Sequence, residues 1–138
     1  MLVVDASVLA VALADDGEDG DTARARLRGE RLAAPELIDL EVASVIRRRV
    51  LRGGMDGRRA VLALEDLAEL PMQRAPHTPL LRRCWELREN LTIYEAAYVA
   101  LAEILQAALL TGDERLASAS GPRCAIDILR TGRERHQR

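Results

Sequence analysis

The sequence contains no lysine and no phenylalanine, so all 20 of its basic residues are arginines. Together with abundant Ala, Leu, Gly and Asp, this composition is typical of a GC-rich genome. The absence of lysine excludes functions that require an ammonium group at the site. Receiver domains and haloacid-dehalogenase-like phosphatases both place acids at strand ends and both rely on such a lysine, so neither class fits this chain.

Cysteines and long apolar runs are also scarce. Cys84 and Cys124 lie far apart without the spacing of metal ligands, so we expect two reduced, partly buried thiols. No segment approaches the roughly 18 apolar residues that cross a bilayer, and Leu2–Val4 is too short an apolar run to form a signal peptide. We therefore expect a cytoplasmic protein with no membrane contact.

Charge and length suit one ordinary globular domain. The 138 residues are 49% hydrophobic and 30% charged, with a net charge of −2. A chain without an overall positive field must contact nucleic acid, if it does so at all, through local clusters of arginine. Glycine-rich loops that hold phosphates are absent, because Gly53-Gly54 lacks the surrounding pattern.

Apolar patterning predicts strands that alternate with helices. The predicted strands are Leu2–Asp5, Arg31–Ala34, Met72–Ala75, Ala108–Leu110 and Cys124–Leu129. The predicted helices are Val8–Ala14, Thr22–Gly29, Pro35–Arg52, Asp56–Leu70, Thr78–Asn90, Thr92–Gln106 and Glu114–Ser118. This order indicates a three-layer α/β/α domain over residues 1–130, with a mostly parallel central sheet. Residues 131–138 form a polar, arginine-rich tail that we expect to fray.

Four acids are expected at one edge of this sheet. Asp5 ends the first strand, Asp113 follows the fourth, Glu95 lies in the first turn of a buried helix, and Glu41 lies in the helix after Pro35. Ligands bind beyond the carboxyl ends of parallel strands. Converging carboxylates repel one another and resist ionising, and a hard divalent cation such as Mg²⁺ relieves that repulsion.

Each acid also has a simpler structural explanation. Asp5 and Asp113 are placed to cap the helices that follow them. Glu95 completes a capping box with Thr92, and Glu41 fits a solvated helix surface. The metal-site hypothesis therefore depends on the joint placement of the four acids and not on any one of them.

The chain resembles the PIN domain, specifically the VapC-type toxin, along nearly its whole length. The matching stretches are Val3–Ser7, Ala34–Ser44, Leu91–Glu103 and Leu110–Ala117. Each stretch is weak alone, but together, in this order and at these separations, they are specific. The resemblance implies a PIN-like fold and a Mg²⁺- or Mn²⁺-dependent endoribonuclease, the toxin of a type II toxin–antitoxin pair.

The resemblance also implies the site. Its metal-binding acids are Asp5, Glu41, Glu95 and Asp113. Ser7 and Thr111 are expected beside them as hydroxyl supports. The family usually has Asp where this chain has Glu95, and the longer side chain predicts metal binding through water or a preference for Mn²⁺.

Roles follow from the chemistry of a bound metal, which lowers the pKa of its water and neutralises phosphate charge. We expect Asp5 and Glu95 to be the most direct ligands and Asp113 to hold the same or a second metal. Glu41 is expected to orient or deprotonate the attacking water. The resemblance implies structured RNA, such as transfer or ribosomal RNA, as substrate, with 5′-phosphate and 3′-hydroxyl products.

Arginines near these acids are expected to contact the RNA. They are Arg47, Arg48, Arg49, Arg52 and Arg115. The first four lie at the end of the helix that carries Glu41, where positive charge also favours a helix C-terminus. That alternative stays open.

Two partners are expected besides RNA. The resemblance, and an apolar excess in helices Pro35–Arg52 and Asp56–Leu70, predict a symmetric homodimer. An antitoxin is expected to inhibit by laying apolar residues in a groove and placing an arginine among the four carboxylates. The alternative function is a catalytically weak PIN-like module that binds RNA or protein; Glu95 in place of Asp favours it, and the complete set of four acids opposes it.

Overall fold

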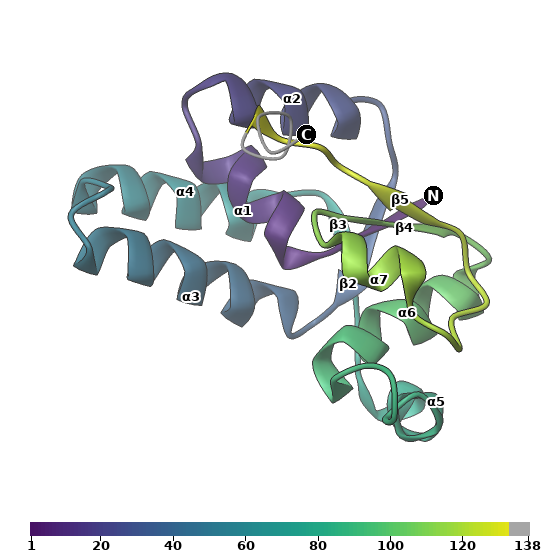
Figure 1. Cartoon of the computed structure of the whole chain (residues 1–138). Coiled ribbons are helices and arrows are strands. Elements are labelled where there is room, and N and C mark those ends of the chain that lie inside the picture. The colour runs from purple at the N-terminus through teal and green to yellow at the C-terminus, as the bar shows by residue number, and fades with distance from the viewer. Residues whose placement is uncertain (133–138) are drawn as a thin grey trace.

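Five short strands form one sheet in the computed structural model, which describes residues 1–132 (Figure 1). The strands are β1 (Leu2–Val4), β2 (Leu32–Pro35), β3 (Met72–Ala75), β4 (Ala108–Thr111) and β5 (Ile126–Ile128). Their order is β3-β2-β1-β4-β5, and all four pairings are parallel. The sheet is therefore wholly parallel, and β1 lies at its centre.

Helices connect the strands and cover both faces. They are α1 (Ala6–Ala14), α2 (Glu18–Leu27), α3 (Ile38–Leu51), α4 (Gly57–Glu69), the 3₁₀ turn η1 (Thr78–Leu80), α5 (Leu81–Glu86), α6 (Ile93–Leu105) and α7 (Glu114–Ser118). Helix α1 packs against α2, α3 and α4, whereas α6 packs on β1, β2 and β4 and contacts α5. Figure 1 shows these two groups on opposite sides of the sheet, which confirms the three-layer α/β/α architecture.

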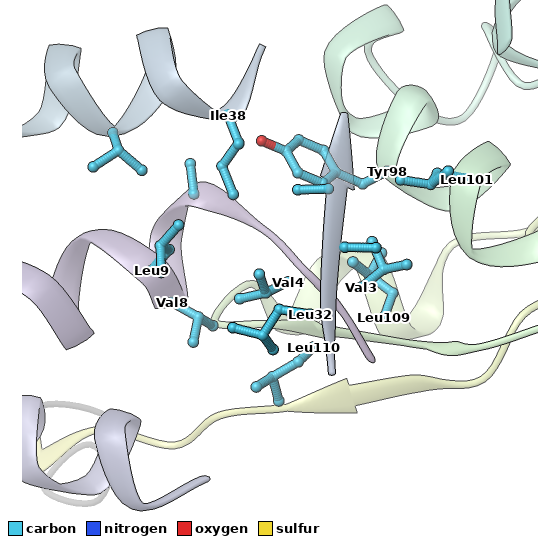
Figure 2. Close-up of a cluster of buried hydrophobic side chains, with 14 of the residues drawn as sticks. Val3, Val4, Val8, Leu9, Leu32, Ile38, Tyr98, Leu101, Leu109 and Leu110 are labelled. Atoms are coloured by element: carbon cyan, nitrogen blue, oxygen red, sulfur yellow. The ribbon is translucent and has the colours of Figure 1, made fainter. Parts of the chain in front are cut away.

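The core lies on both faces of β1. Val3 and Val4 are fully buried, and successive side chains of a strand point to opposite faces. Figure 2 shows Val4 beside Val8 and Leu9 of α1, and Val3 toward Leu101 of α6. Such a strand has no solvent face, so it is apolar throughout, as the sequence of β1 is. Within residues 1–132, none of the helices is both long and apolar enough to cross a membrane.

Helix α2 begins earlier than its sequence predicts. The polar stretch after α1 was expected to delay the helix until Thr22, but α2 begins at Glu18. The Asp15 carboxylate accepts hydrogen bonds from the backbone N–H groups of Gly17, at 2.8 Å, and Gly20, at 3.2 Å. These bonds satisfy donors at the start of a helix that lack partners within it. Only three residues, 15–17, therefore separate α1 from α2.

Other boundaries also differ from expectation, including those of β5, which is Ile126–Ile128 where Cys124–Leu129 was predicted. Pro35 ends β2, where it pairs with Ala75, and α3 begins at Ile38. The helix expected to run to Asn90 ends at Glu86. The predicted tail at 131–138 lies, from residue 133 onward, outside the described residues, and the domain boundary stays a prediction.

Gly20 allows the close approach of α2 to the end of α1. A Cβ atom at Gly20 lies 1.8 Å from the carbonyl oxygen of Asp15, whereas one at Gly57, the first residue of α4, meets no heavy atom within 4 Å. We expect Gly20→Ala to lower the free energy of unfolding by about 2–3 kcal/mol and Gly57→Ala to raise it by about 0.5 kcal/mol. Urea unfolding of the two variants measures this difference, and equal stabilities would contradict the close contact.

Candidate active site

Four acids from four separate elements line one cavity of about 420 Å³ at the carboxyl edge of the sheet. Asp5 and Asp113 follow β1 and β4, which pair directly, so the two residues lie at neighbouring strand ends. Glu95 comes from the first turn of α6 and Glu41 from the first turn of α3. The structure thus brings all four acids around a shared space.

Asp5 is held by hydrogen bonds on both carboxylate oxygens. Oδ1 accepts from the Ser7 hydroxyl and from the backbone N–H of Ser7 at 2.9 Å and of Val8 at 3.4 Å, so Asp5 caps α1. Oδ2 accepts from the hydroxyl of Thr111, which is fully buried. Burial raises the pKa of Asp5, and the hydrogen bonds from Ser7 and Thr111 oppose that rise.

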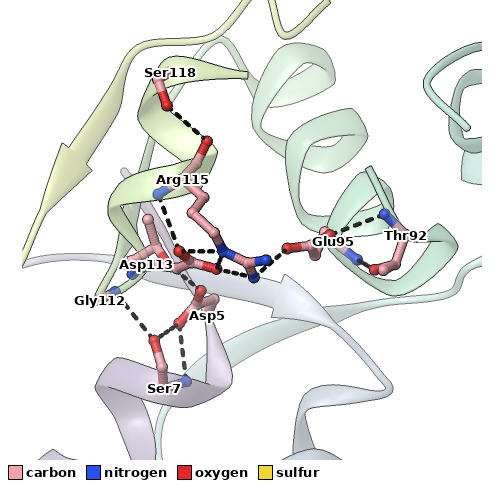
Figure 3. Close-up of polar contacts among 9 residues, drawn as sticks. Asp5, Ser7, Thr92, Glu95, Gly112, Asp113, Arg115 and Ser118 are labelled. Carbon is pink, nitrogen blue, oxygen red and sulfur yellow. Dashed lines mark hydrogen bonds and ion pairs between the residues drawn. The ribbon is translucent and has the colours of Figure 1, made fainter. Parts of the chain in front are cut away.

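The two hydroxyls join the ends of β1 and β4. The Ser7 Oγ accepts a 3.1 Å hydrogen bond from the Gly112 N–H (Figure 3). The Thr111 Oγ1 accepts one of 3.1 Å from the Asp113 N–H. Each hydroxyl therefore donates to Asp5 and accepts from the loop after β4. Ser7 and Thr111 lie beside the acids and orient Asp5.

Glu41 contacts a residue that sequence reasoning missed. The Tyr98 hydroxyl donates a 2.6 Å hydrogen bond to Glu41 Oε1. Burial raises the pKa of Glu41, the negative charge of Asp5 raises it further, and the bond from Tyr98 opposes both. Tyr98 is buried on α6, one turn after Glu95. A signal for it existed, because a tyrosine in an otherwise apolar helix needs a partner for its hydroxyl.

Glu95 is a helix cap and also lines the cavity. Its Oε1 accepts a 2.9 Å hydrogen bond from the Thr92 N–H, and its own N–H donates to the Thr92 Oγ1 at 3.1 Å. This is the expected capping box. The second carboxylate oxygen, Oε2, lies 3.8 Å from the Arg115 guanidinium (Figure 3).

Arg115 lies between two of the acids. Its Nε is 3.1 Å from Asp113 Oδ1 and its Nη2 is 2.7 Å from Asp113 Oδ2, and the same Nη2 faces Glu95. The Arg115 side chain holds the pKa of Asp113 below its usual range. RNA contact by Arg115 stays a prediction; in this structure its guanidinium pairs with carboxylates.

The arginines of α3 separate in space. Arg48 lines the same cavity as the acids, and it donates a 3.1 Å hydrogen bond to the Ser44 hydroxyl. Arg47 lies on another face of α3, in a groove shared with Leu51 and Leu64. Consecutive helix residues point about 100° apart, so four clustered arginines cannot all face one site. RNA contact by Arg47, Arg48, Arg49 and Arg52 stays a prediction.

The donors present fit a hard divalent cation bound partly through water. The four acids supply only oxygen atoms, and Arg115 already places a positive charge against two of them. Within residues 1–132, no three acidic, histidine or cysteine side chains lie close enough together to bind one ion. Mg²⁺ commonly takes one or two carboxylates and keeps several waters, so this spacing suits it.

Comparison with known proteins defines the class. The PIN domain family model matches residues 2–122. The VapC ribonuclease Mb0985 of Mycobacterium bovis is 44% identical over 132 residues, covering 94% of this chain and 98% of that protein. Ribonuclease VapC1 of Mycobacterium tuberculosis is 43% identical over 129 residues, with 93% and 97% covered. The chain belongs to the PIN-domain family, among the VapC-type ribonuclease toxins.

Solved structures agree on the fold. PAE2754 from Pyrobaculum aerophilum superposes with a TM-score of 0.67 at 27% identity, covering 92% of this chain and 83% of that one. FitAcB from Neisseria gonorrhoeae gives 0.68 at 12% identity, with 92% and 96% covered. The relatives are named as ribonucleases, so the protein is an enzyme, and the non-enzymatic alternative gains no support.

The pKa of Asp5 has a consequence for stability. A carboxyl with a raised pKa binds its proton more readily in the folded chain, so its contribution to stability is greatest below the ordinary value of 3.8 and is lost as the pH rises through the raised value. Asp5→Asn keeps a capping side chain. We expect this variant to unfold a few degrees higher than wild type at about pH 7 and to lose that difference at about pH 4.

Asp113→Asn is the matched control, measured like Asp5→Asn by thermal unfolding in EDTA. Arg115 lowers the pKa of Asp113, so this carboxyl stabilises the fold above its ordinary pKa and the stabilisation is lost as the pH falls. Because the Arg115 side chain is exposed and such pairs contribute little, the Asn variant should be only slightly less stable than wild type at neutral pH, and the difference should vanish as the pH falls. The same pH trend in both variants would show that burial does not raise the pKa of Asp5.

Proposed function

We propose that this ribonuclease is a Mg²⁺- or Mn²⁺-dependent endoribonuclease that cleaves structured RNA, such as transfer or ribosomal RNA. The observation that carries the proposal is the convergence of Asp5, Glu41, Glu95 and Asp113 on one cavity. The names of the relatives support RNA as the substrate. VapC20 of Mycobacterium tuberculosis, a fold neighbour at 16% identity, is described as a sarcin-ricin loop cleaving toxin. That loop is one substrate to test.

The four acids have different roles, which follow from their surroundings. Asp5, held rigidly by Ser7 and Thr111, is the ligand whose position depends least on the metal. Glu95 and Asp113 hold the same or a second ion. When bound, the cation lowers the pKa of a water and neutralises charge on the phosphate. Glu41, whose pKa is raised by burial, orients the attacking water or accepts a proton from it.

Side chains at the mouth of the cavity are suited to RNA. Arg48 lines it and supplies a guanidinium for phosphate. Tyr94 also lines it and is 66% exposed, so its ring offers a surface on which an unpaired base stacks. Cleavage is expected to leave a 5′-phosphate and a 3′-hydroxyl.

Variants of Asp5 and Glu95 test the metal-dependent mechanism. Asp5→Asn keeps the cap of α1 but loses a ligand charge, so we expect cleavage to fall by about 100-fold or more while the fold persists. Glu95→Gln keeps an oxygen for the Thr92 N–H, so the free energy of unfolding should change by less than about 1 kcal/mol while Mn²⁺-dependent cleavage falls strongly. Sequencing of RNA ends and titration with Mn²⁺ measure both effects.

Thr92→Val is the control for Glu95. It removes the hydroxyl that accepts from the Glu95 N–H and leaves the Glu95 charge in place. We expect it to lose about 1 kcal/mol of stability and to keep cleavage near the wild-type rate. Unchanged cleavage by a folded Asp5→Asn protein would refute the metal site. If Glu95→Gln loses stability and keeps activity, Glu95 is a cap alone.

Two protein partners complete the proposal, a second copy and an antitoxin. Leu51 of α3 and Leu64 of α4 are 66% and 38% exposed, and both line an apolar groove between the two helices. An exposed apolar surface of this kind suits a protein interface. We expect dimers at tens of micromolar by light scattering, and monomers for Leu51→Glu. A wild-type monomer at that concentration refutes the dimer.

A further inference from the structure

The Arg115 guanidinium connects two carboxylates that come from different parts of the fold. Its Nε and Nη2 bond to Asp113, the residue before α7, and its Nη2 lies 3.8 Å from Glu95 of α6 (Figure 3). Both acids line the cavity proposed to hold the metal. The guanidinium therefore neutralises two carboxylates that a divalent cation would need as ligands.

The ion pairs of Arg115 with these two carboxylates are easily broken. The Arg115 side chain is 84% exposed, against 31% for Asp113 and 27% for Glu95. Exposed ion pairs contribute little to stability, because water solvates both charges and a long side chain must be ordered. A guanidinium cannot lose its proton in a protein, so a change of protonation does not release these carboxylates, whereas a competing cation can.

Release of Arg115 leaves both acids in position. The backbone N–H of Arg115 donates a 3.0 Å hydrogen bond to Asp113 Oδ1, and this bond does not need the guanidinium. Glu95 keeps its 2.9 Å bond from the Thr92 N–H. The carboxylates that Arg115 occupies are therefore placed by backbone contacts of their own and stay available to a metal.

We infer that Arg115 is an internal counter-ion that competes with the divalent cation for Asp113 and Glu95, so that the cation binds only as the guanidinium leaves. The inference rests on the proposed metal-dependent function. It makes Arg115 a counter-ion of the metal-free enzyme, which neutralises part of the acidic cluster until the cation arrives.

Mn²⁺ affinity, measured by calorimetry on the full chain without RNA, tests the competition. We expect Arg115→Gln to bind Mn²⁺ about fivefold more tightly than wild type, because the competitor is gone. Arg48→Gln is the matched control, since it removes the same charge from the same cavity but its guanidinium bonds to Ser44 and not to an acid. In 0.1 M salt we expect its affinity to rise less than about twofold.

The outcomes separate this inference from the proposed function. Equal or weaker Mn²⁺ binding by Arg115→Gln, or an equal gain in Arg48→Gln, overturns the competition and leaves the metal-dependent function standing. No Mn²⁺ binding by wild type and Arg115→Gln overturns both. Thermal unfolding of Arg115→Gln near the wild-type temperature shows that the Asp113 cap is intact, and a loss of folding overturns the claim that the acids are placed independently.

A second measurement follows the guanidinium itself. The Nε–H resonance of Arg115, assigned by its disappearance in Arg115→Gln, reports the hydrogen bond to Asp113 in ¹⁵N-labelled protein. We expect diamagnetic Mg²⁺ to shift this resonance in step with metal binding, because the bond breaks. A resonance that stays unchanged at saturating Mg²⁺ means that Arg115 remains on Asp113, which overturns the inference.

Discussion

The hydrogen bond from the buried Thr111 hydroxyl to Asp5 is the contact on which the rest of the site depends. It joins the ends of β1 and β4, and the same hydroxyl accepts from the Asp113 N–H. A buried carboxylate without such donors would be costly to ionise. Thr111 thus connects Asp5 to the loop after β4, which leads to Asp113 and Arg115.

Capping and ligand placement are the same physical arrangement in this protein. Asp5, Glu95 and Asp113 each accept a backbone N–H at the start of a helix, and each lines the cavity. A cap restricts the rotation of the carboxylate, and the positive end of the helix dipole lowers the cost of its charge. In Glu95 and Asp113 the backbone bond uses one carboxylate oxygen and leaves the other to meet a cation, whereas Asp5 accepts hydrogen bonds on both oxygens.

The balance of charge in the cavity explains why a cation matters for an RNA substrate. Phosphates are repelled by four carboxylates, and the chain as a whole has a net charge of −2. Arg115 neutralises part of the cluster, and Arg48 lies at its edge. Binding of a divalent cation would turn the same acids into a surface that accepts phosphate, so metal and substrate affinities are expected to be coupled.

The sequence alone determined the order of strands and helices, the parallel sheet and the presence of acids at its carboxyl edge, because these follow from local periodicity and from the Thr92–Glu95 capping pattern. Tertiary structure decided the rest. The bond from Tyr98 to Glu41 spans 57 positions, the early start of α2 depends on a loop carboxylate, and the choice of Arg48 over Arg47 depends on how α3 is rotated. Such contacts join residues that no local pattern relates, and only packing brings them together.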